Sequence, residues 1–314
     1  MTAPIAAPPT APPSPQSFAD RVVVLAADIK LSHSVFALPW AILATFIAAA
    51  GTSPTRLPRV GQIALIVACM VLARTAAMSA NRLFDADLDR ANPRTARRAV
   101  PSGRLSKGFV AAAIVGCALA FVGVTALFGV FYSNWIPLAA SLPILGFICS
   151  YPFLKRFSRL CHYYLGAALA LAPICAWVAI AGCIDREPLW MAAAVMLWTA
   201  GFDIIYACQD YENDRAAKLY SVPSGVGIAN ALWAARVTHV GCWAALLQLG
   251  LASPLLSTAY FCAIGVTAVL LIVEHAIVRP NDLSKVNVAF FTLNGIISLL
   301  IGTAGLVDVL RHVR

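Results

Sequence analysis

Apolar residues run in long blocks along this chain, and polar residues are gathered in short stretches between the blocks. Charged side chains are absent from four long segments, which lie between Lys107 and Lys155, between Arg159 and Asp185, between Arg236 and Glu274, and between Lys285 and Asp308. A helix of about 20 apolar residues crosses the hydrocarbon core of a bilayer. The blocks are continuous, whereas the strands of a membrane β-barrel alternate apolar and polar residues, so a barrel is excluded. The pattern predicts membrane-spanning helices.

Two of these segments are long enough for a helical hairpin, and each contains helix breakers, at 133–137 in the first and at 252–254 in the second. Division of the chain at such signals predicts nine helices, near residues 32–51, 60–82, 108–130, 135–152, 160–182, 188–208, 230–250, 255–276 and 287–307. The predicted fold class is an all-α integral membrane protein, a bundle of nine transmembrane helices. Residues 20–314 form its single domain, and residues 1–19, rich in proline and alanine, are predicted to be a disordered tail.

The balance of charge supports this interpretation and predicts an orientation. Hydrophobic residues make up 61% of the chain and charged residues 12%, which is about half the charged fraction of an average soluble protein. With nine spans, seventeen lysines and arginines lie on the side of the N-terminus and five on the other. Cytoplasmic loops carry the excess of positive charge, so we expect a bacterial cytoplasmic (inner) membrane and a cytoplasmic N-terminus. The net charge of +9 then requires no nucleic-acid partner.

Two short stretches on the same side are rich in acids, which the positive-inside rule does not explain. The aligned residues are Asn81, Asp85 and Asp89 in the first stretch, and Asp203, Asp210 and Asp214 in the second. The first three are spaced i, i+4 and i+8, which places them on one helix face. The second three are spaced i, i+7 and i+11 and superpose within about 20° on a helix of 3.6 residues per turn. Each of two predicted spans therefore ends in an acidic stripe.

Acidic stripes at a membrane edge need cations, because like charges one helical turn apart repel and ionisable groups near hydrocarbon are costly unless paired or hydrated. Mg²⁺ binds carboxylate oxygens, keeps several waters and completes its shell with substrate phosphates. The stripes thus predict a metal and diphosphate site, whose catalytic residues and Mg²⁺ ligands are Asp85, Asp89, Asp210 and Asp214. Arg94 and Arg98, in the loop after the first stripe, are expected to bind phosphate oxygens. Asp87 and Glu212 point off the two faces and are expected to be solvated.

The order and spacing of these residues resemble the motifs of the UbiA superfamily of intramembrane aromatic prenyltransferases, over nearly the whole chain from about residue 28. The first stripe matches the pattern Asn-x-x-x-Asp-x-x-x-Asp. The other matches are Arg94, Thr95 and Arg98 to Arg-Thr-x-x-Arg, Tyr151 and Lys155 to Tyr-Pro-x-x-Lys, and the second stripe with Tyr206 and Ala207 to Asp-x-x-Tyr-Ala-x-x-Asp-x-x-x-Asp.

The resemblance implies an Mg²⁺-dependent enzyme of quinone biosynthesis that transfers a polyprenyl group from its diphosphate to an aromatic acid similar to 4-hydroxybenzoate. It also implies a central cavity in the bundle for the prenyl substrate, with the bilayer as the source of that lipid. The residues it places at the substrates are Asn81, Arg94, Arg98, Tyr151, Lys155, Asp203, Tyr206 and Lys30. An apolar interior would keep water away from the allylic carbocation that forms when the diphosphate leaves.

Two alternatives remain open at this point. The segment 28–39 and the sequence at 206–210 look closer to a subgroup linked to menaquinone made through futalosine, whose acceptor would be 1,4-dihydroxy-6-naphthoate. Lys30 either binds the acceptor carboxylate or reaches the interface as an ordinary lysine, and Arg74 is expected to pair with substrate or an aspartate. A secondary transporter is the other class, but it would hold its acids near mid-membrane, without an arginine-rich loop beside them.

Overall fold

The computed structural model describes residues 17–30, 36–53 and 55–313. The long helices in these ranges are α2 (Leu38–Thr52), α3 (Val60–Phe84), α5 (Lys107–Tyr132), α6 (Ile136–Leu154), α7 (Cys161–Ala181), α8 (Arg186–Ala207), α11 (Ile228–Ala252), α12 (Thr258–Ile277) and α13 (Asn294–Val313). The short ones are α1 (Phe18–Asp28), α4 (Ala86–Ala91), η2 (Cys208–Asp210), α9 (Tyr211–Ala216), α10 (Val222–Val226) and the π-helical turn η3 (Val288–Leu293). Each predicted segment overlaps one long helix, with ends that differ by up to seven residues.

Seven helical segments of the described chain are long and apolar enough to cross a membrane. They are α3, α5, α6, α7, α8 with η2 and α9, α12, and η3 with α13. α2 is apolar as well but has only 15 residues, and α11 has 25 residues with Arg236 among them. The molecule is therefore an all-helical integral membrane protein.

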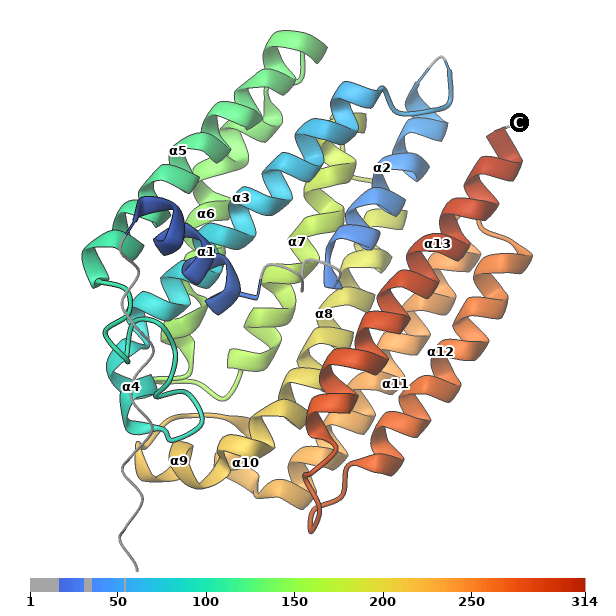
Figure 1. The fold of residues 1–314 in the computed structure, drawn as a ribbon. Coiled ribbons are helices and arrows are strands. Elements are labelled where there is room, and N and C mark those ends of the chain that lie inside the picture. The colour runs from blue at the N-terminus through green and yellow to red at the C-terminus, as the bar shows by residue number, and fades with distance from the viewer. Residues whose placement is uncertain (1–16, 31–35, 54, 314) are drawn as a thin grey trace, which may run out of the picture.

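The long helices run alongside one another, and the short helices α4, α9 and α10 lie together at one end of the bundle, at the bottom of Figure 1. The C-terminal end of α13 lies at the opposite end, at the top of the same view. Because α4 follows α3 and α9 follows α8, both acidic stretches belong to the lower end. We call this the acidic end of the bundle.

α8 is the central helix, and it positions the second acidic stretch. In its apolar window 67% of the residues are buried, against at most 33% in the other six segments. A Cβ atom on Gly166 of α7 would lie 2.3 Å from the carbonyl oxygen of Met196, so only glycine allows the two backbones to approach this closely. On α2, Trp40 packs against Trp198 of α8, with ring centroids 5.8 Å apart.

α1 was not predicted, and it corrects the boundary of the N-terminal tail. The helix begins at Phe18, so residues 18 and 19 are helical. Ser17 caps it reciprocally: the Asp20 amide donates to Ser17 Oγ and the Ser17 amide donates to Asp20 Oδ2, each at 3.1 Å. This capping box is a known helix start. The remainder of the predicted tail, residues 1–16, lies outside the described residues.

Neither acidic stretch is one unbroken α-helix. Asp85 separates α3 from α4, yet the amides of Asp85 and Asp89 still donate to the carbonyls four residues earlier, at 3.0 and 2.7 Å, so the first stripe keeps its spacing. In the second stretch Asp203 lies in α8, Asp210 in η2 and Asp214 in α9. A 3₁₀ turn has 3.0 residues per turn instead of 3.6, so the predicted superposition of these three acids on one continuous helix is wrong.

Removal of the Asp308 carboxylate should destabilise the protein without affecting its chemistry. Asp308 of α13 is fully buried and caps α12 from outside: Oδ2 accepts from the amides of Ser257 and Tyr260, both at 2.8 Å. Asp308→Ala leaves these amides unpaired, at a cost of about 1–3 kcal/mol, measured as a lower midpoint of thermal unfolding in detergent. Asp185 precedes α8 but makes no side-chain cap, so Asp185→Ala is the control. Equal midpoints for the two variants would contradict the capping role.

Candidate functional site

Asp85 lies at the junction of α3 and α4 and is 1% exposed. Its Oδ2 accepts from Lys155 Nζ at 2.7 Å and from Asn81 Nδ2 at 2.8 Å. Oδ1 accepts no hydrogen bond from the described residues, and Arg156 Nη2 lies 3.6 Å away. Lys155 follows α6, so this cluster joins the first acidic stretch to the loop between α6 and α7. One oxygen of a buried carboxylate is left available for a further cation.

Asp89 is held by the loop that follows it. Arg98 Nη1 donates to both carboxylate oxygens, at 2.8 and 2.7 Å, and Asp89 is only 6% exposed. Thr95 Oγ1 donates to the Asp89 carbonyl at 3.0 Å, which folds the loop back onto α4. The three residues of the Arg-Thr-x-x-Arg pattern therefore include one that shapes the loop and one that neutralises the first acidic stretch.

Arg94, the remaining residue of that pattern, reaches across to the second acidic stretch. Its Nε and Nη2 atoms donate to the two oxygens of Asp210 at 2.9 and 2.5 Å, and its Nη1 donates to Tyr206 Oη at 2.9 Å. Asn92 Nδ2 adds a bond of 2.9 Å to Asp210 Oδ1. Burial lowers the pKa of Arg94, but the hydrogen bonds to Asp210 and its negative charge outweigh burial and raise the pKa above its usual value. This guanidinium therefore remains charged.

Asp203 does not join the other acids, because it is paired with a histidine that sequence reasoning missed. His162 Nδ1 lies 2.7 Å from Asp203 Oδ2. The backbone amide of Val222 donates to His162 Nε2 at 3.2 Å, so the proton of the neutral ring is on Nδ1 and is donated to Asp203. Asp214 of α9 interacts electrostatically with Ser221, the residue before Val222. His162 thus connects α8 to the segment that follows the second acidic stretch.

Lys30 and Tyr151 complete the predicted set. The Tyr151 hydroxyl, near the end of α6, donates to Met78 Sδ of α3 at 3.8 Å. Lys30 Nζ lies 4.3 Å above the ring of Phe291. Burial, followed by the charges of three arginines of the acidic end, lowers the pKa of Lys30 below its usual value. Lys30 therefore lies in the same basic surroundings as Arg94 and Arg98, the arginines expected to bind phosphate.

A second missed pair supports the first acidic stretch from α1. Arg82 Nε lies 3.0 Å from Asp28 Oδ2, and both side chains are nearly buried. Asp28 Oδ1 accepts from the Ala99 amide at 2.8 Å, and Arg82 Nη1 donates to Asn81 Oδ1 at 2.8 Å. No local signal in the sequence identifies this pair, because the two residues are 54 positions apart. Arg74 donates to the carbonyl of Lys30 at 3.3 Å, which is a backbone group and not the predicted aspartate.

Comparison with known proteins shows which family this chain belongs to. The model of the UbiA prenyltransferase family matches residues 37–296. This chain belongs to the UbiA prenyltransferase family. The family match includes every predicted site residue except Lys30, which precedes it.

Individual UbiA relatives agree with this membership. The chain is 34% identical over 190 residues to a 4-hydroxybenzoate octaprenyltransferase of Paracidovorax citrulli (strain AAC00-1), a match that covers 59% of this chain and 62% of that protein. The structure of a UbiA homologue from Aeropyrum pernix K1 is similar, with a TM-score of 0.74, 29% identity and coverage of 88% of this chain and 98% of that one. A UbiA homologue from Archaeoglobus fulgidus bound to GPP and Mg²⁺ shares the fold, with a TM-score of 0.64, 19% identity and coverage of 92% and 99%.

The donor set of this UbiA chain suits a hard divalent cation. Carboxylate oxygens are the ligands that Mg²⁺ takes, and the buried Oδ1 of Asp85 accepts no hydrogen bond from the described residues. Within those residues no three His, Cys, Asp or Glu side chains converge on one point, because basic residues stand between the acids. The pairs Asp85–Lys155, Asp89–Arg98 and Asp210–Arg94 would have to open for the acids to share a metal.

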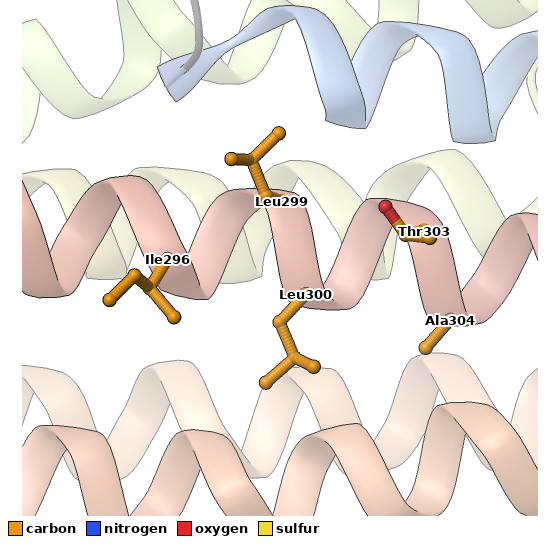
Figure 2. Close-up of a pocket in the computed structure, with 5 residues that line it drawn as sticks. All are labelled: Ile296, Leu299, Leu300, Thr303 and Ala304. Atoms are coloured by element: carbon orange, nitrogen blue, oxygen red, sulfur yellow. The ribbon is translucent and has the colours of Figure 1, made fainter.

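Apolar hollows of the bundle lie among its long helices. One is a shallow groove on α13 between α2 and α12, shown in Figure 2, where Leu299 points toward α2 and Leu300 and Ala304 point toward α12. Another is lined by residues of α6, α7 and α8, among them Phe147 and Met196. Both hollows are lined by apolar residues almost throughout, as expected of surfaces that contact lipid or a prenyl chain.

Proposed function

We propose that this protein transfers a polyprenyl group from its diphosphate to an aromatic acid of the 4-hydroxybenzoate type, with Mg²⁺, in quinone biosynthesis. The observation that carries the proposal is the set of three acid–base pairs at one end of an apolar helical bundle. Support comes from the name of the Paracidovorax citrulli relative and from the GPP and Mg²⁺ bound by the Archaeoglobus fulgidus homologue. A transporter would place its acids at mid-membrane, whereas these lie at helix ends beside arginines.

In this proposal the acids hold the metal and the bases hold the diphosphate. Asp85, Asp89, Asp210 and Asp214 would bind Mg²⁺, which supplies charge neutralisation of the leaving diphosphate. Arg94, Arg98 and Lys155, now paired with these acids, would exchange carboxylate oxygens for phosphate oxygens as the substrate arrives. Arginine suits this exchange because its planar fork matches both groups equally well. Asn81, Asp203, Tyr151 and Tyr206 would line the substrates between the two stretches.

The reaction also requires a cavity that excludes water. The allylic C–O bond breaks with its electron pair leaving on the diphosphate, a ring carbon of the acceptor bonds to the allylic carbon, and the ring proton leaves to restore aromaticity. Water would capture the allylic cation, so the prenyl chain must lie among apolar side chains. We place it in a central cavity of a single membrane domain with nine spans, α2 and α11 added to the seven apolar segments. The acidic end and the N-terminus would face the cytoplasm, in the inner membrane of a bacterium.

Metal removal and acceptor choice test the proposed function together. Full-length protein in detergent or nanodiscs, with Mg²⁺, a polyprenyl diphosphate and 4-hydroxybenzoate, should release diphosphate and form a prenylated aromatic acid. EDTA should stop both, and excess Mg²⁺ should restore both, since the acids act on the diphosphate only through the metal that neutralises the leaving group. A parallel reaction with 1,4-dihydroxy-6-naphthoate identifies the acceptor. Absence of prenylated product with both acceptors, for prenyl chains from ten to forty carbons (about two to eight isoprene units), would refute the proposal.

A further inference from the structure

A fully buried polar cluster lies outside the acidic stretches, between α8, α12 and α13. Glu274, Asn294 and Trp198 all have 0% exposure. Asn294 Oδ1 accepts from Trp198 Nε1 at 2.5 Å, and Asn294 Nδ2 donates to Glu274 Oε1 at 2.9 Å. Polar side chains inside a membrane bundle are expensive and are retained where they have a task. None of these three residues belongs to the motifs discussed above.

The cluster closes the π-helical turn η3. Asn294 directly follows η3, and its Nδ2 atom also donates to the carbonyl of Ala289 inside the turn, at 3.0 Å. π-turns are rare within helices and are frequently found at functional sites. The Asn294 side chain therefore links an irregular backbone segment to two neighbouring helices, and its loss would free that segment.

The π-turn places two consecutive aromatic rings next to Tyr206, at the acidic end of the bundle. The ring of Phe290 lies 4.3 Å from that of Tyr206, and the ring of Phe291 lies 6.1 Å from it. Successive side chains of a regular α-helix point about 100° apart, whereas both of these rings lie beside Tyr206. Tyr206 is the residue whose hydroxyl accepts from Arg94, and Lys30 Nζ lies over the Phe291 ring.

We propose that Phe290 and Phe291 form the aromatic wall of the acceptor pocket and that Asn294 is the positioning residue that fixes this wall through the π-turn. The inference rests on the proposed function, since it assigns the acceptor side of that site. An aromatic acid can pack against the rings of Phe290 and Phe291 with its carboxylate toward Lys30, whose ammonium covers one face of Phe291, while Tyr206 and Arg94 separate it from the diphosphate. Stacked or edge-to-face rings with centroids 4.5–7 Å apart favour each other beyond simple burial.

Acceptor binding tests the wall without requiring turnover. We would titrate the full chain with 4-hydroxybenzoate and with 1,4-dihydroxy-6-naphthoate, and in parallel measure KM for acceptor and for polyprenyl diphosphate. Asn294→Leu and Phe291→Leu should weaken acceptor binding and raise the acceptor KM about tenfold, with less than about a twofold change in the KM for the diphosphate. Phe291→Leu keeps the polar cluster intact, so it tests the wall even where Asn294→Leu fails to fold.

Asn134 provides the matched control. Its Nδ2 atom also donates to two helix carbonyls, those of Val178 and Ala179 at 2.8 and 3.1 Å, but at the end of α7 away from the acids. Asn134→Leu should leave both KM values unchanged. Unchanged acceptor binding in Phe291→Leu, or equal changes in both KM values, would overturn the inference, as would a wild-type chain that binds neither acceptor. Acceptor binding that depends on Phe291 without any turnover would instead refute the proposed function and keep the pocket.

Discussion

Asp85→Ala should lower the rate of prenyl transfer by about a thousandfold or more, the largest effect expected of any single substitution. Asp85 is buried, faces Lys155 and retains one oxygen without a hydrogen bond from the described residues. Loss of a single preorganised hydrogen-bond donor lowers kcat by about 10²–10³. Loss of a metal ligand should have a larger effect, because it weakens the binding of a divalent cation. Diphosphate release under saturating substrate and Mg²⁺ measures the effect.

Asp87 provides the control for Asp85. It lies two residues away, and its side chain is 74% exposed, with Arg90 and Lys107 as loose partners at 3.6 and 3.2 Å. Exposed ion pairs of this kind contribute little to stability, so Asp87→Ala should retain activity within about twofold. A folded Asp85→Ala protein that turns over as fast as Asp87→Ala would exclude Asp85 from the metal site. Asp85→Asn, which preserves the volume, separates loss of charge from loss of packing.

The acidic stretches could be found from sequence because membranes make charge scarce. Asp85, Asp89, Asp210 and Asp214 stand at helix ends where topology demands basic residues. Their partners were harder to assign, since a loop arginine serves equally as topological charge and as ligand. The structure divides the roles: Arg98 turns back to its own stretch, whereas Arg94 crosses to Asp210, 116 positions away.

Other features had no periodic signal to find. The Asp28–Arg82 pair depends on how α1 folds against α3, and α1 itself is a short helix that begins at a capping box. The π-turn η3 interrupts an otherwise regular apolar run, and hydrophobicity does not distinguish π from α geometry. His162 stands in an apolar helix, where a lone histidine gives no indication that its partner is Asp203. The Asp28–Arg82 and His162–Asp203 pairs depend on contacts between distant segments, which one sequence does not reveal.

Arg94→Lys should reduce kcat/KM for the polyprenyl diphosphate by about a hundredfold, although the charge is unchanged. A lysine has one ammonium group and cannot reproduce the fork that bonds both oxygens of Asp210 and the Tyr206 hydroxyl. Bidentate contact is also the geometry in which a guanidinium binds phosphate oxygens. The effect should be smaller than that of Asp85→Ala, because Arg98 and Lys155 still supply positive charge next to the acids.

Arg97 is the matched control, because it lies in the same loop, is exposed, and contributes to the loop through its backbone carbonyl, which accepts from Arg104. Arg97→Lys should change kcat/KM by less than about twofold.

A double variant that carries Arg94→Lys and Asp210→Asn tests whether the two residues act together. Its fold-loss in kcat/KM should be smaller than the product of the two single fold-losses, because both residues act on one diphosphate and each depends on the other for its position. Full multiplicativity would show that Arg94 and Asp210 act independently. Equal rates for Arg94→Lys and Arg97→Lys would show that Arg94 is topological charge alone. The bidentate contact to Asp210 in the unliganded protein would then have a structural purpose, and diphosphate binding would fall to Arg98 and Lys155.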